Sequence, residues 1–160
     1  MEIISNTTNN NHLAVIKKLI ESSTKIIISS GWMKKDGLEK LIPSFEKTIK
    51  NNHALITIFS NIHPHTQKLA SRKLEIYKKS IKHIIVPLNK KTLHTKMYYF
   101  EKDNIFTVVI GSANITSGGL LNSEELSILI EEKQNSKFHQ EILEYIKSLE
   151  HLYGKCLTHP

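Results

Sequence analysis

Cysteine, arginine and tryptophan each occur once in the 160-residue sequence, as Cys156, Arg72 and Trp32. A single cysteine allows neither a disulfide within the chain nor a cysteine-based metal cluster. A single arginine argues against base-specific reading of duplex DNA, because guanines in the major groove are usually read by several arginines. Apolar runs stay far below the roughly 20 residues that span a bilayer, and the first residues lack a secretory-signal pattern. We therefore expect a cytoplasmic protein that does not insert into a membrane.

Positive charge is abundant although the chain has only one arginine. The formal net charge is +7 and the isoelectric point is about 9.4, almost entirely from lysine. Such a balance favours a polyanionic partner, either nucleic acid or an anionic lipid surface. The length suits one core, so we expect a single domain over residues 1–160.

The hydrophobic pattern predicts an α/β fold in which helices flank a mixed β-sheet. We expect the helices over 10–22, 36–50, 65–80 and Phe138–Leu152, and Pro43 should divide the second of them into two pieces. We expect buried strands at Lys25–Ser30, Ala54–Ser60, Ile81–Leu88 and Glu124–Glu132, and a hairpin with strands near 95–101 and 105–111.

Two polar groups of residues flank that hairpin. His94 and Lys96 stand two positions apart, so in a strand their side chains point to the same face. Gly111 allows close backbone approach, and Ser112 and Asn114 follow it with the same spacing. Ammonium, hydroxyl and carboxamide groups can donate hydrogen bonds to a phosphodiester, while an imidazole can act as nucleophile or as acid and base. Either group alone is typical of a solvated surface or a turn, but their combination favours a phosphate site.

The segments "HTK" and "GSANITSGGLLNSEEL" resemble the HKD signature of the phospholipase D superfamily, in particular its small single-motif bacterial nucleases. This resemblance implies a phospholipase D-like sandwich and a metal-independent phosphodiesterase without cofactor. His94 would form a phosphohistidine or protonate the leaving group, and Lys96, Asn114 and Ser112 would hold the phosphate. Glu125 would orient the histidine through its Nδ1 proton, which would fix the imidazole tautomer.

The sequence departs from the signature at its acidic position. Glu101 stands where the family has aspartate, and Asp103 is an alternative match. In the hairpin turn we expect either acid to be solvated or paired with a lysine, with a structural rather than a chemical role.

The His-x-Lys element occurs only once, whereas the chemistry of the superfamily uses two histidines. A two-fold homodimer would bring two copies of His94 and Lys96 to one phosphate. Two lysines there would neutralise the developing charge, so no metal would be needed.

Other candidate residues carry weaker signals. His63 and His65 have no convincing third metal ligand, so we expect no metal site. Trp32 is interpreted as a core or dimer-interface residue, or as a base-stacking residue that lines a substrate groove together with Lys34 and Lys35.

The favoured function is that of an endonuclease, with DNA favoured over RNA as the substrate. A helicase or a specificity subunit is a possible partner. The alternatives are a phospholipase D-type lipid phosphodiesterase or phosphatidyltransferase, and a non-catalytic phosphate-binding module. The absence of an apolar surface segment disfavours the lipid enzyme, and the complete set of catalytic-type residues disfavours the binding module.

Overall fold

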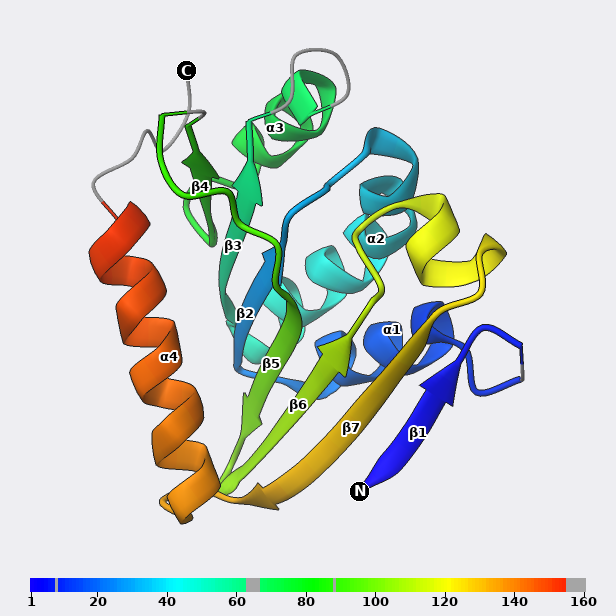
Figure 1. The fold of residues 1–160 in the computed structure, drawn as a ribbon, viewed down its shortest axis with the longest axis vertical. Helices are drawn as coiled ribbons and strands as arrows, with labels where there is room; N and C mark the ends of the chain where they lie inside the picture. Colours follow the sequence, from blue (N-terminus) through cyan, green and yellow to red (C-terminus); the bar gives the residue numbers. More distant parts are fainter. Residues whose placement is uncertain (8, 63–66, 88, 155–160) are drawn as a thin grey trace.

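A seven-stranded mixed β-sheet forms the centre of the structure, a computed structural model that describes residues 1–7, 9–62, 67–87 and 89–154 (Figure 1). The strand order is β1-β7-β6-β5-β2-β3-β4. The strands are β1 (Glu2–Ser5), β2 (Lys25–Ser30), β3 (Leu55–Asn61), β4 (Ile81–Val86), β5 (Lys96–Lys102), β6 (Ile105–Gly111) and β7 (Leu126–Lys133). Strands β2, β3 and β4 are parallel, and all other pairings are antiparallel.

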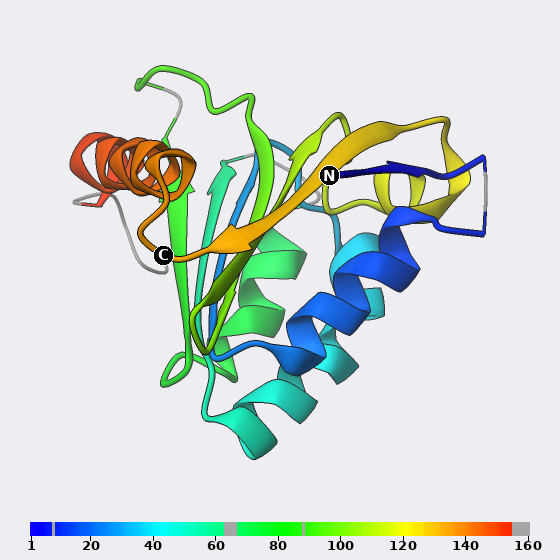
Figure 2. The same cartoon turned by 90° about the horizontal axis from the view of Figure 1, so that it is seen from below.

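Helices cover the two faces of the sheet unequally. The helices are α1 (His12–Ser22), α2 (Lys35–Asn52), α3 (Gln67–Glu75) and α4 (Lys137–Tyr153). Figure 2 shows α4 alone on one face and the other three helices on the opposite face. One core lies under α1, α2 and α3, and a second core lies under α4. The face under α4 is covered only in part, which leaves the β6, β7 and β1 side of that face open (Figure 1).

The predicted α/β class and most elements are confirmed. Strands β2 to β6 and helices α1 and α4 lie close to their expected positions, although Leu88 at the end of the third predicted strand lies outside the described residues. The third helix is shorter than expected. It ends at Glu75, and turns occupy 76–80, where the backbone N–H of Tyr77 bonds the oxygen of Leu74 and that of Ser80 bonds the oxygen of Tyr77.

The predicted break at Pro43 is wrong, because α2 runs without interruption from Lys35 to Asn52. A proline inside a helix costs about 3 kcal/mol through the lost N–H and the clash of its ring. Pro43 lies on the exposed side, whereas Leu38, Leu41 and Phe45 are buried on the other side. The continuous apolar face therefore offsets the local cost.

The last predicted strand exists, but it is not the buried strand that its composition indicated. Leu126 and Ile128 in β7 are exposed, because the neighbouring part of the face is not covered by α4. β1 was not predicted at all, and it pairs with β7 at the edge of the sheet. Within the described part of the chain, no helix is long and apolar enough to cross a membrane.

Candidate active site

The predicted site residues meet at one end of the sheet. Lys96 begins β5 and pairs with Ser30 at the end of β2, while Gly111 ends the adjacent strand β6. Antiparallel pairing places the start of one strand beside the end of its neighbour. His94, Ser112 and Asn114 lie within three residues of these strand ends, and Glu125 immediately precedes β7, which pairs with β6. The sheet topology therefore collects these residues from separate parts of the sequence.

His94 and Lys96 lie side by side, as predicted. The Nζ atom of Lys96 donates to the backbone oxygen of His94 at 2.7 Å and lies 3.3 Å from Nδ1 of its ring. Partial burial lowers the pKa of the Lys96 ammonium, and the negative charge of Glu125 acts in the opposite direction. A bound phosphate would add compensating negative charge beside this ammonium. His94 itself is exposed, so its imidazole is accessible to a substrate.

The side-chain amide of Asn114 has a fixed orientation. Its Oδ1 accepts hydrogen bonds from the backbone N–H of Trp32 at 3.0 Å and from the hydroxyl of Ser30 at 3.3 Å. A backbone N–H can only donate, so the oxygen of the amide must face Trp32. Within the described part of the chain, the Nδ2 group of Asn114 has no hydrogen-bond partner. It is therefore available to donate to a phosphate oxygen.

Ser112 and Glu125 bind each other. The hydroxyl of Ser112 donates to the carboxylate of Glu125 and accepts from the backbone N–H of Leu126 at 3.1 Å. In this structure the carboxylate of Glu125 thus contacts Ser112 rather than the imidazole of His94, in contrast to the expected pairing. Because the Ser112 proton is engaged, its hydroxyl would have to leave Glu125 before it could donate to a phosphate.

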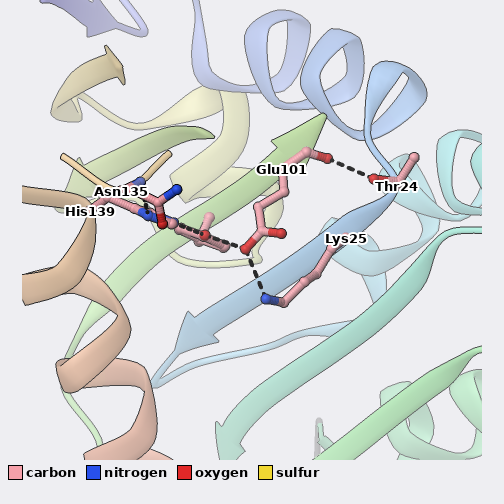
Figure 3. Close-up of polar contacts among 6 residues, drawn as sticks. Thr24, Lys25, Glu101, Asn135 and His139 are labelled. Carbon is pink, nitrogen blue, oxygen red and sulfur yellow. Dashed lines mark hydrogen bonds and ion pairs between the residues drawn. The ribbon is translucent and has the colours of Figure 1, made fainter. Parts of the chain in front are cut away.

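The acidic candidates lie at the opposite end of the sheet, so neither belongs to the site. Five residues at about 3.4 Å each place Glu101 roughly 17 Å from Lys96 along β5. Glu101 accepts a hydrogen bond from Lys25 at 2.8 Å, which confirms the expected pairing with a lysine (Figure 3). Asp103 is exposed in the hairpin turn and has a positive φ of 52°.

Glu101 also belongs to a chain of hydrogen bonds that fastens α4 to the sheet (Figure 3). It accepts from the hydroxyl of Tyr99, whose oxygen lies 2.8 Å from Nε2 of His139, and the N–H of Asn135 donates to Nδ1 of the same histidine. Burial opposes ionisation of Glu101, but the bonds from Lys25 and Tyr99 outweigh it and lower the pKa of the carboxyl. This acid therefore has a structural role.

The candidate groove residues follow β2 on the Asn114 side of the site. Trp32 is 56% exposed, so its interpretation as a core residue is wrong. Lys34 is exposed and its backbone N–H binds the oxygen of Ile115, while Lys35 pairs with Glu39 at 3.8 Å. A role for these residues in a substrate groove or a dimer interface remains a prediction.

Asn61, at the end of β3, holds the loop that carries His94. Its amide donates to the backbone oxygen of Leu93 at 2.7 Å and to that of Gly31 at 3.1 Å, while its Oδ1 accepts from the N–H of Leu93 at 2.9 Å. A Cβ atom on Gly31 would lie 2.5 Å from the Leu93 oxygen, so this close approach requires glycine. An asparagine at the end of an apolar strand was the available sequence signal for this role. Its partners Gly31 and Leu93 are distant in sequence, so the signal could not identify them.

His12 supports the other side of the site. It is fully buried, and its ring nitrogens lie 2.8 Å from Oδ1 of Asn6 and from the hydroxyl of Ser127. Asn6 can only accept at this oxygen, so Nδ1 of His12 carries a proton and Nε2 accepts from Ser127. Burial lowers the pKa of this imidazole, which favours its neutral form. His12 thus anchors the start of β7, beside Glu125.

The described residues contain no group of three or more histidine, cysteine, aspartate or glutamate side chains that could hold a metal ion. The weak candidates His63 and His65 lie outside the described residues, as does Cys156. The expectation of a site without metal therefore rests on the sequence resemblance and on the chemistry of Lys96 and Asn114.

Residues 8–156 match the family model of the NgoFVII restriction endonuclease N-terminal phospholipase D domain. The chain belongs to this family. The resemblance to the phospholipase D superfamily is therefore confirmed. As a member of this family, the chain is a phospholipase D-type nuclease domain, a hydrolase of phosphodiester bonds. Among curated proteins, no significant match is found.

Solved structures share the fold of this phospholipase D domain. Nuc from Salmonella typhimurium, a phospholipase D family member, has a TM-score of 0.68 at 17% identity over 95% of this chain and 94% of its own. NucT from Helicobacter pylori has a TM-score of 0.64 at 13% identity over 89% of each chain. Yeast tyrosyl-DNA phosphodiesterase has a TM-score of 0.54 at 22% identity, covering 83% of this chain but only 34% of its own. The predicted phospholipase D-like sandwich is therefore confirmed.

Proposed function

We propose that this phospholipase D domain hydrolyses nucleic acid, with DNA favoured over RNA, at a metal-independent site shared by two copies of the chain. The observation that carries the proposal is the cluster of His94, Lys96 and Asn114 at one end of the sheet. An accessible imidazole lies beside an ammonium, and an amide with a free N–H group completes a cradle for a phosphate. The net charge of +7 suits a polyanionic substrate.

The proposed reaction has two steps. An imidazole nitrogen of one His94 attacks phosphorus, and the bond to the departing oxygen breaks as that oxygen takes a proton from the second His94. The second His94, now a base, then removes a proton from water, and the resulting hydroxide displaces the first imidazole from phosphorus. Lys96 and Asn114 stabilise the negative charge on the five-coordinate phosphorus, which is the role that a metal ion would otherwise take.

An exposed apolar surface next to the site supports the homodimer. Ile3, Ile110, Leu126 and Ile128 are between 38% and 68% exposed, and we call them the apolar sheet face. The register pairs Ile128 with Ile3 on one side and with Ile110 on the other, so these side chains lie on one face of the sheet. Contiguous exposed apolar residues are typical of protein interfaces.

A second copy of the chain is the occupant that this surface fits. Ile110 precedes Gly111 and Ser112, and Leu126 follows Glu125, so the apolar sheet face continues directly into the site. A two-fold axis near this boundary would bring the two His94 side chains toward each other. Because each chain supplies one His-x-Lys element and the reaction uses two imidazoles, the same contact would complete the chemistry.

Sequence specificity would come from elsewhere. Arg72 is the single arginine of the chain, which leaves little capacity for reading guanines. A separate specificity domain, a specificity subunit or a helicase would then choose the place of cleavage.

A substrate panel tests the proposed function. The chain is incubated with plasmid DNA, single-stranded DNA, RNA and phosphatidylcholine vesicles, each with excess EDTA and, in parallel, with Mg²⁺. We expect cleavage of nucleic acid at similar rates in both conditions, DNA being cut faster than RNA. Inhibition by EDTA that one divalent ion reverses would contradict the metal-independent site. Hydrolysis of the lipid alone would identify a lipid enzyme, and binding without cleavage of any substrate would identify a phosphate-binding module.

A further inference from the structure

A pocket of about 400 Å³ opens beside the catalytic histidine, on the side facing α4. One wall is the segment 91–95, which includes His94, and the other is the C-terminal half of α4. Figure 1 shows this segment next to the end of α4. The volume is within the range of about 300–1,000 Å³ that is typical of small-molecule sites. We call this cavity the His94 pocket.

The walls of the His94 pocket combine apolar and hydroxyl groups. Leu93, Leu149 and the half-exposed Leu152 supply the apolar surface. The hydroxyl groups of Thr95 and Tyr145 lie 2.5 Å apart and connect the His-x-Lys segment to α4. Each of these hydroxyls keeps further hydrogen-bonding capacity, because only one proton is shared between them.

The rim of the pocket is basic and firmly held. Lys91 is exposed there, and its backbone oxygen accepts a hydrogen bond from the hydroxyl of Tyr153 at 2.8 Å. The 91–95 segment is therefore tied to α4 at Lys91 and at Thr95, and to β3 by Asn61 at Leu93. A pocket whose walls are tied in this way is formed before any ligand arrives, which reduces the ordering cost of binding.

We propose that the His94 pocket holds the base of a nucleotide next to the scissile phosphate, an inference that rests on the proposed nuclease function. Because His94 forms part of the wall, a phosphate at the imidazole would place a neighbouring nucleotide at the pocket entrance. Aliphatic side chains can pack on the faces of a base, and hydroxyl groups can bond its polar edge in either direction. The ammonium of Lys91 at the rim suits the next phosphate of the strand. The pocket would then add affinity and base preference to a phosphate site that does not itself contact the bases.

Dinucleotides with a single scissile bond test this assignment. The substrates are thymidylyl-thymidine and two counterparts, one without its 5′ base and one without its 3′ base. For wild type, we expect removal of the base that the pocket holds to lower kcat/KM at least tenfold. Removal of the other base should lower kcat/KM less. Ser148→Trp places an indole in the pocket from an exposed position of α4, and it should reduce the larger effect to about twofold. Cleavage of the substrate without that base should be unchanged.

The controls separate failure of the pocket from failure of the nuclease. Gln140→Trp adds the same ring two turns away on the exposed side of α4 and should retain the wild-type base preference. Leu152→Trp, a second substitution in the pocket wall, should reproduce the effect of Ser148→Trp. An unchanged base effect in both pocket variants, or no base effect in wild type, would overturn the subsite. No cleavage of any dinucleotide by wild type, together with no cleavage in the substrate panel, would instead overturn the proposed function.

Discussion

Replacing His94 by alanine is expected to lower cleavage at least a thousandfold, because the substitution removes both the nucleophile and the proton donor from a shared site. A thousandfold loss corresponds to about 4 kcal/mol of barrier, within the range of acid–base and nucleophilic contributions of one side chain. The imidazole is exposed, and among the residues that the structure describes its ring has hydrogen-bond contacts only with Lys96. Folding and nucleic-acid binding should therefore remain close to wild type.

For His94→Ala we would measure turnover, the thermal unfolding temperature and the affinity for an unreactive nucleic acid. His151→Ala is the matched control, because His151 is exposed on α4 and does not line the site. We expect wild-type turnover from this control. Activity of His94→Ala within about tenfold of wild type would remove the residue from the catalytic role.

Replacing Ile128 by glutamate is expected to dissociate the proposed dimer and to abolish cleavage. The substitution puts one carboxylate into the apolar sheet face of each chain, where the cost of desolvating both charges opposes association. Because Ile128 is exposed in the monomer, the fold itself should tolerate the carboxylate. We expect a monomer by sedimentation or light scattering, with turnover reduced at least a hundredfold.

Leu55→Glu is the control for this experiment. Leu55 is 67% exposed and begins β3, at the end of the sheet opposite the site. The same change there should leave both the oligomeric state and the activity unaltered. Ile128→Glu chains that remain dimeric would remove the apolar sheet face from the interface, and fully active monomers would contradict a shared site.

Local patterns in the sequence predicted the centre of the fold well. The β-branched runs of β2, β3 and β4 and the polar turn of the β5–β6 hairpin are signals that each segment carries within itself. The two-residue spacing of His94 and Lys96 also predicted their proximity. Ser112 and Asn114 directly follow the end of β6, and the hairpin turn places that end beside the start of β5. Their closeness to Lys96 could therefore be predicted.

Features that depend on distant partners could not be read in the same way. The exposure of Ile128 follows from where α4 ends its coverage of the sheet, which no local pattern records. Asn61 acquires its role only when β3 brings it to Leu93, and Glu125 meets Ser112 across two strand ends. Pro43 misled the prediction because the buried face of α2 outweighs a local preference.

The shared site is tested most directly by mixing wild-type chains with His94→Ala chains after subunit exchange. If both imidazoles are required, activity should follow the square of the wild-type fraction, because mixed dimers are inactive. At a wild-type fraction of about one tenth, roughly 1% of the activity should then remain. Activity that falls only in proportion, to roughly 10%, would mean that each chain carries a complete site, and it would contradict the shared-site mechanism.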